Sequence, residues 1–168
     1  MRTLLILLAL LAFPAFAQPM LEAKLEIRVL DFMIEPASRG EVAVLFDRDN
    51  ADSLKEANEM LRAFQQSAGL AHSRFAPKLV ERHALDQEHD LKAVVLSRFI
   101  AESDDDILLY GVSHRTLVLA GGVECVQRKQ CAVGVATTPE IQIAVRGDMI
   151  RQSGIRFADG FTLMVKEF

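Results

Sequence analysis

Short, continuous apolar runs recur along most of the chain. The clearest lie at 42–46, 93–96 and 117–120, and Val, Leu and Ala supply most of their residues. Runs of four or five apolar residues without polar alternation are typical of strands that a parallel sheet buries on both faces. Together with two weaker runs, they predict five strands, at 41–46, 78–83, 92–96, 116–120 and 141–145.

A capping box follows the first of these strands. Residues 53–56 read Ser-Leu-Lys-Glu, which predicts that a helix begins at Ser53. A glycine beyond the last periodic residue commonly ends a helix, and Gly69 takes that place here. The expected buried face of this helix consists of Leu54, Ala57, Leu61 and Phe64.

Three more helices are expected in the second half of the chain. The first starts at Ser103 and the acids 104–106, because carboxylates favour the positive end of the helix dipole. The second covers 147–153 and ends at Gly154, and the third covers 157–168.

The segment 21–34 fits two patterns. Alternation with polar residues, as in a strand, holds for Leu21, Ala23, Leu25, Ile27 and Val29, and a helical stripe holds for Leu21, Leu25, Val29, Phe32 and Met33. The high content of Leu, Glu, Lys and Ala favours the helix. Pro36 ends the element in either case.

The order of these elements predicts the fold class. Strands and helices alternate through residue 120, which implies right-handed crossovers and a largely parallel sheet. The segment 121–135 then predicts a late antiparallel hairpin. We therefore expect an α/β protein with one domain, residues 18–168, built as a three-layer sandwich.

The N-terminus has the layout of a secretory signal peptide. Arg2 precedes an apolar run at 4–17, and Ala15 and Ala17 provide small residues before Gln18. The run is too short for a membrane span, which needs about 20 apolar residues. We expect cleavage near Ala17, a signal peptide at 1–17, and a periplasmic mature protein that does not itself span the membrane.

Composition excludes some classes of partner. The formal net charge is −4, and removal of Arg2 with the signal peptide takes it to −5. An acidic chain has no electrostatic attraction to phosphate backbones, so nucleic acid is not an expected partner. The sequence has no tryptophan and one tyrosine, so aromatic platforms for sugars are also poorly supplied.

The only two cysteines are Cys125 and Cys131, and in an exported chain they predict a disulfide. In a hairpin whose turn centres on Arg128, these two residues face each other and Val123 faces Val133. Closing so short a loop contributes about 2–2.5 kcal/mol in the chain-entropy model. A redox-switch role stays open, whereas the spacing does not match a zinc site.

No segment carries a catalytic, cofactor or metal motif. The loop 47–52 follows a strand, but Asp52 stands where a calcium loop needs glycine, and no Gly-rich phosphate loop is present. No serine lies in a nucleophile elbow. The histidines are scattered at His72, His83, His89 and His114. We predict no catalytic residue, no cofactor, no metal site and a protein that is not an enzyme.

The order of features in the second half resembles a known family. An apolar run leads to Gly121-Gly122 and the cysteine pair, and then to Pro139-Glu140-Ile141, Ser153-Gly154 and an expected closing apolar helix. In order and spacing this is similar to the YfiR-like family of periplasmic proteins, a single α/β sandwich after a signal peptide. The resemblance covers most of residues 18–168.

The resemblance implies regulation rather than catalysis. Well-understood members bind the periplasmic part of an inner-membrane diguanylate cyclase and hold it inactive, which restrains cyclic-di-GMP signalling and biofilm formation. It implies the same kind of partner here, with a homodimer as one form and a hairpin disulfide that keeps the partner-binding shape. The alternative function is a small-molecule sensor or binding domain, with its ligand at the strand ends near Asp47 and Ser97.

Overall fold

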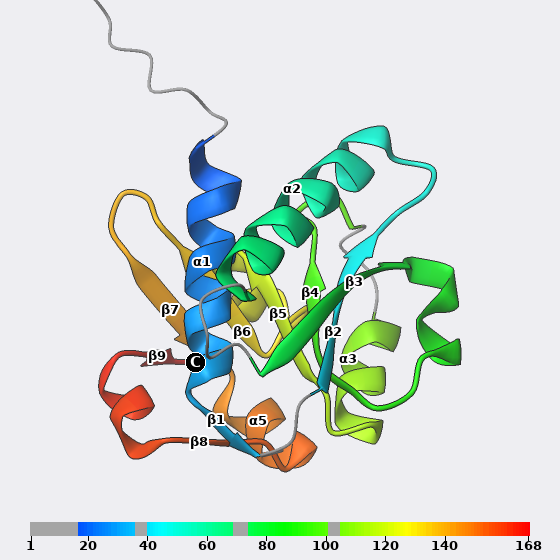
Figure 1. The fold of residues 1–168 in the computed structure, drawn as a ribbon. Coiled ribbons are helices and arrows are strands. Elements are labelled where there is room, and N and C mark those ends of the chain that lie inside the picture. Colours follow the sequence, from blue (N-terminus) through cyan, green and yellow to red (C-terminus); the bar gives the residue numbers. More distant parts are fainter. Residues whose placement is uncertain (1–16, 36–39, 69–73, 101–104) are drawn as a thin grey trace, which may run out of the picture.

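The computed structural model describes residues 17–35, 40–68, 74–100 and 105–168 (Figure 1). The strands are β1 Met33–Glu35, β2 Gly40–Phe46, β3 Phe75–Glu81, β4 Leu91–Leu96, β5 Leu117–Gly121, β6 Val133–Ala136, β7 Gln142–Val145, β8 Arg156–Phe157 and β9 Lys166–Glu167. The α-helices are α1 Ala17–Asp31, α2 Ala51–Ala68, α3 Asp105–Ser113, α4 Glu124–Gln127 and α5 Gly147–Ser153, and the 3₁₀ helices are η1 Arg82–Gln87 and η2 Asp159–Leu163. Several predicted features lie outside the described residues, namely 1–16 of the signal peptide, Pro36, Gly69, His72, Ser103 and Asp104.

One mixed sheet organises the described residues. Its strand order is β3-β2-β4-β5-β6-β7-β9. All neighbours from β3 to β6 are parallel, β7 is antiparallel to β6, and β9 is parallel to β7. The expected α/β class, with a largely parallel sheet and a late antiparallel pair, is confirmed.

The sheet is buried on both faces. On β2, Val42 and Val44 belong to the core that also holds residues of α1 and α2, whereas Ala43 and Leu45 belong to the core that holds residues of η1 and α3. This alternation follows from the two-residue period of a strand. Figure 1 shows α1 and α2 side by side on one face, with α3 on the other. The expected three-layer sandwich is therefore present.

The predicted strand boundaries need one large correction. β2, β4, β5 and β7 match their predictions to within one residue, but β3 begins and ends earlier than the predicted 78–83. It includes Pro77, which lacks a backbone N–H. Because β3 is an edge strand of the sheet, it tolerates a proline that a central strand would not.

Segment 21–34 is helical only as far as Asp31. Its last residues instead form β1, which pairs antiparallel with β8 and sets Met33 opposite Phe157. The predicted helix therefore ends too late, because the last residues of the segment pair with β8 near the C-terminus.

The predicted helix at 157–168 is wrong. The segment contains the end of β8, the 3₁₀ helix η2 and strand β9. Phe161 is buried and stacks on Phe157, with 4.2 Å between ring centroids, whereas Leu163 is 88% exposed. Phe161 thus lies in the core and Leu163 in solvent, so the apolar residues of this segment do not share one helical face. The pairing of β9 with β7 takes precedence over the helical pattern.

The predicted hairpin at 121–135 is also wrong, although its disulfide is confirmed. β5 and β6 are parallel, and α4 lies in the crossover between them. Parallel neighbours need a crossover of about a dozen residues, which matches the length of this segment. Cys125 on α4 bonds to Cys131 just before β6, with 5.4 Å between their Cα atoms. The antiparallel pair of this region is instead β6 and β7.

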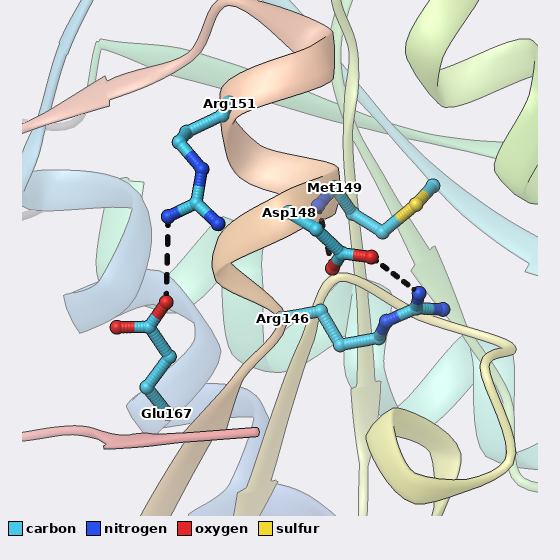
Figure 2. A network of polar contacts seen from close by, with 5 residues as sticks. All are labelled: Arg146, Asp148, Met149, Arg151 and Glu167. Carbon is cyan, nitrogen blue, oxygen red and sulfur yellow. Dashed lines mark hydrogen bonds and ion pairs between the residues drawn. The ribbon is translucent and has the colours of Figure 1, made fainter.

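Helix α5 matches its prediction, and ion pairs join it to the residue before it and to strand β9. Gly154 ends it in the left-handed conformation, with φ of 67°. Arg146, directly after β7, donates to Asp148 over 2.8 Å, and Arg151 pairs with Glu167 of β9 over 3.4 Å (Figure 2). Among the described residues no helix combines the length and the apolar character that crossing a membrane requires.

Candidate functional site

The strand order defines a switch point in the sheet. From β2 the chain adds β3 on one side and β4 on the other, so the connections after β2 and β4 diverge at their carboxyl ends. Open α/β sheets bind ligands at such points. Asp47 follows β2 and Ser97 follows β4, as the predicted binding site requires.

Protein groups fill the switch point itself. Ser53 and Ser97 are buried, and their hydroxyl oxygens lie 2.6 Å apart in a hydrogen bond. The Ser53 hydroxyl also accepts a hydrogen bond from the backbone N–H of Asp47 over 3.0 Å. The structure therefore brings Asp47 and Ser97 close together. Ser53 lies between them and forms a hydrogen bond with each.

This role of Ser53 corrects the predicted capping box. Helix α2 begins at Ala51, and the side-chain oxygen of Asn50 accepts hydrogen bonds from the N–H groups of Asp52 and Ser53. Asn50 is thus the capping residue, and Ser53 turns its hydroxyl toward the sheet. Leu54, predicted in the buried face, is exposed, whereas Ala57 and Phe64 are buried as predicted and Leu61 is half-buried.

A cleft of about 420 Å³ lies beside the switch point, at the carboxyl ends of β4 and β5. Its walls come from α1, α3 and α4, from the ends of β4, β5 and β6, and from the loops that follow these strands. The charged and polar residues of its lining include Glu22, Ser97, Arg98, Glu124, Arg128, Gln130 and Thr138, together with Gly121 and Gly122. Ser97 is thus at the cleft, whereas Asp47 is not among its lining residues.

Arg98 lies just after the carboxyl end of β4 and forms ion pairs with two glutamates. Its Nε lies 2.9 Å from Oε1 of Glu56, and one terminal nitrogen lies 3.2 Å from Oε2 of Glu22. The backbone N–H of Arg98 also donates to Oε2 of Glu56 over 2.7 Å. One arginine therefore joins α1, α2 and the loop after β4 through charge-assisted hydrogen bonds.

Burial changes the acidity of these glutamates. Removal from water raises the pKa of Glu22 and of Glu56, and the Arg98 charge opposes that rise at both. Glu26 is completely buried, and neither of its carboxyl oxygens has a hydrogen-bond partner among the described residues. Desolvation and the nearby carboxyls raise the pKa of Glu26 to about 8, so it is mainly protonated at neutral pH.

The sequence pattern did not reveal these glutamates. Leu21 belongs to the predicted apolar stripe of the first helix, yet it is 47% exposed. The helix instead turns Glu22 and Glu26 inward, together with Val29 of the predicted stripe. Spacing of four residues places both glutamates on one face, where Glu22 pairs with the distant Arg98 and Glu26 has no hydrogen-bond partner among the described residues.

Gly121 and Gly122 line the cleft with backbone that carries no side chains. A Cβ atom on Gly121 would lie 2.7 Å from Oε2 of Glu22, and a Cβ atom on Gly122 would lie 2.8 Å from Oε2 of Glu124. Gly122 also has φ of 89°, a conformation that side-chain-bearing residues rarely adopt. Glycine at this step thus allows two carboxylates to approach the backbone closely.

The remaining predicted residues do not form a site with this cleft, except for one cysteine. Cys125 lines the cleft and Cys131 is buried behind it. His83, His89 and His114 are exposed, and none of them lines the cleft. Within the described ranges, no group of three or more His, Cys, Asp or Glu residues is arranged to hold a metal ion.

Comparisons with known proteins establish the fold and leave the family open. No family model matches the sequence, and no curated protein matches it. The structure is similar to a conserved domain protein from Vibrio cholerae O1 biovar El Tor strain N16961, with a TM-score of 0.61 and 7% identity. It is also similar to an ABC domain from Streptococcus pneumonia in complex with L-Trp, with a TM-score of 0.60 and 7% identity.

Each alignment covers 89% of this chain and 59% of the other chain, so this chain spans about three fifths of the length of those structures. At 7% identity these likenesses show the fold alone.

Proposed function

We propose that this protein binds a small charged molecule in the cleft at the carboxyl ends of β4 and β5. The observation that carries the proposal is the gathering of charged side chains of both signs, from α1, α4 and the loop after β4, around one cleft. A volume of about 420 Å³ is within the range of sites for small molecules. The edge of the sheet is the one at which α/β folds bind ligands.

The structural likeness adds support to this proposal. A domain with a similar fold is described in complex with L-Trp, and the fold is therefore compatible with small-molecule binding. We extend this only to the general activity, binding of a small molecule, because fold does not imply a particular ligand.

Native mass spectrometry of the protein purified from its producing cells tests the proposal. We expect an additional mass of a small molecule that is lost on denaturation. Ala136 is half-buried and lines the cleft, so Ala136→Phe should fill it and abolish the additional mass. Ala76→Phe, at an exposed position of edge strand β3, is the matched control and should retain it. Retention in both variants would place the ligand elsewhere and refute the proposal.

A second proposal is that the protein regulates an inner-membrane signalling protein from the periplasm. The resemblance to the YfiR-like family supports it and suggests the periplasmic part of a diguanylate cyclase as partner, and hence control of cyclic-di-GMP and biofilm formation. The disulfide fits an oxidising compartment outside the cytoplasm. Exposed apolar residues suited to a protein contact occur around β7 and β9, namely Ile141, Leu163, Met164 and Phe168.

Capture of membrane proteins from the producing cell tests this second proposal. We expect the wild-type protein to retain an inner-membrane protein with a cytoplasmic signalling domain. Leu163→Glu should prevent capture, because Leu163 is among the exposed apolar residues near β9. Leu109→Glu, at an exposed position on α3, is the matched control and should not. Capture of no membrane protein by the wild type would refute regulation of this kind.

A further inference from the structure

One side of the cleft is apolar, and its residues come from one face of the sheet. The lining includes two residues at the ends of β4 and β5, one in the loop after β4 and one on α3, namely Leu96, Ala120, Ile100 and Ile107. All four belong to the core on the α3 face, and the half-buried Cys125 packs against the same core. Within the described part of the chain, no residue of the lining belongs to the core that holds residues of α1 and α2.

The opposite side of the cleft carries charge. Glu22 comes from α1 and pairs with Arg98, which also pairs with Glu56 of α2. Helices α1 and α2 cover the face of the sheet opposite α3 (Figure 1). These ion pairs therefore hold the Arg98 side chain on the α1 side. The charge of Glu124 acts on Glu22, which places a second carboxylate near the same side.

The end of β5 separates the two sides. Ala120 belongs to the core on the α3 face, whereas a Cβ atom on the next residue, Gly121, would lie 2.7 Å from Oε2 of Glu22. Successive positions of a strand face opposite sides of a sheet, so these two neighbours face the two sides of the cleft. A molecule that lies across the end of β5 therefore meets apolar side chains on one side and charged groups on the other.

We propose that the ligand of this cleft is an amphiphile, with an apolar tail on the α3 side and a charged head on the α1 side. This inference rests on the proposed function of the cleft and names the chemical class of its ligand. The reverse orientation is unfavourable, because it removes the charged head from water without a partner and covers the charged groups of the protein with an apolar tail. In the proposed orientation each methylene group that leaves water strengthens binding about fourfold.

Isothermal titration calorimetry with two series of probes tests the inference. One series is acetate, butyrate and hexanoate, and the other is ethylammonium, butylammonium and hexylammonium, because charges of both signs line the cleft. In at least one series we expect the affinity to rise about 15-fold from the four-carbon to the six-carbon member, the effect of two buried methylenes. The six-carbon probe should also bind with the more negative heat-capacity change, which marks burial of apolar surface.

Variants then locate the tail. Ile107→Thr places a hydroxyl on the apolar side, so the gain from two methylenes should fall below about fourfold. Leu109→Thr, on the same helix but 67% exposed and outside the lining, is the matched control and should keep the full gain. Ala120→Ser repeats the test from β5 with a smaller change in volume, and circular dichroism checks the fold of each variant. A full gain in both cleft variants would place the tail elsewhere and overturn the inference.

The probes separate failure of this inference from failure of the proposed function. Affinity that does not change with chain length, in a series that binds, would overturn the amphiphile and retain a ligand-binding cleft. Binding of none of the six probes would also overturn the amphiphile, and the mass-spectrometric experiment would then decide whether the cleft binds any molecule.

Discussion

Replacement of Glu26 by leucine should stabilise the protein, and the gain should grow as pH rises. Glu26 is completely buried in the contact between α1 and its neighbours, and both carboxyl oxygens lack partners among the described residues. Removal of a buried, unpaired titratable group by an apolar side chain of similar size is often neutral or stabilising. The effect should therefore depend on how much charge the wild-type residue carries at each pH.

The magnitude follows from the shift in acidity. The pKa of Glu26 rises from its ordinary value of 4.5 to about 8, and each unit of pKa corresponds to about 1.4 kcal/mol. The folded protein therefore binds the proton more tightly than the unfolded chain does, and between these two values it holds more protons. Stability must then fall as pH rises from 4.5 to about 8, by about 5 kcal/mol in total from this one residue.

Urea unfolding followed by circular dichroism at pH 5, 6, 7 and 8 measures this effect. Circular dichroism is the suitable signal because the chain has no tryptophan and a single tyrosine. We expect the advantage of Glu26→Leu over the wild type to increase by about 4 kcal/mol between pH 5 and pH 8, within the limit set by the pKa.

Two further variants make the measurement specific. Glu26→Gln should show the same loss of pH dependence at lower stability, because its amide donors remain buried without partners. Glu140→Gln, on the surface, should follow the wild type. A difference between Glu26→Leu and the wild type that stays constant from pH 5 to pH 8 would refute the argument.

Three further outcomes test the packing. Cys125→Ser should lower the free energy of unfolding by about 2–2.5 kcal/mol without abolishing the fold, and reductant should lower the wild type to the same level in a thermal melt. Phe161→Ala should cost about 3–5 kcal/mol in urea unfolding, whereas Leu163→Ala should change stability by less than about 0.5 kcal/mol, and equal costs would contradict the burial of η2. Ser97→Ala should cost about 1–3 kcal/mol, and a double-mutant cycle with Ser53→Ala should show coupling; additive losses would mean that the hydroxyls do not interact.

The central strands were predictable because strands buried on both faces consist of continuous apolar residues. Runs such as 42–46 and 93–96 are apolar at every position, since each strand faces a core on both sides. Helix α5 was predictable for a similar local reason, because Gly154 adopts the left-handed conformation that ends a helix. The start of α2 is a local exception, because the side chain of Asn50 caps this helix in place of the predicted Ser53.

The remaining errors involve partners that are distant in the sequence. Glu22, on the buried face of α1, has its ion-pair partner in the distant Arg98, and the residues after that helix pair with β8. The parallel arrangement of β5 and β6 depends on α4, whose four residues give too weak a signal to distinguish a crossover from a hairpin. The same reason hid the cleft, because its walls meet only after the sheet has formed.

The pairing of β1 with β8 has a consequence for the order in which the chain can fold. Helix α1 packs mainly against α2, which follows closely in the chain, whereas Met33 of β1 meets Phe157, so β1 finds its partner strand only when the last part of the chain is present. A chain that emerges from its N-terminus must therefore keep β1 without its partner strand while about 120 further residues appear. Contacts between such distant segments also slow folding, because long loops must close first. During that interval the backbone of β1 is open to chaperones and proteases, which the paired strand excludes.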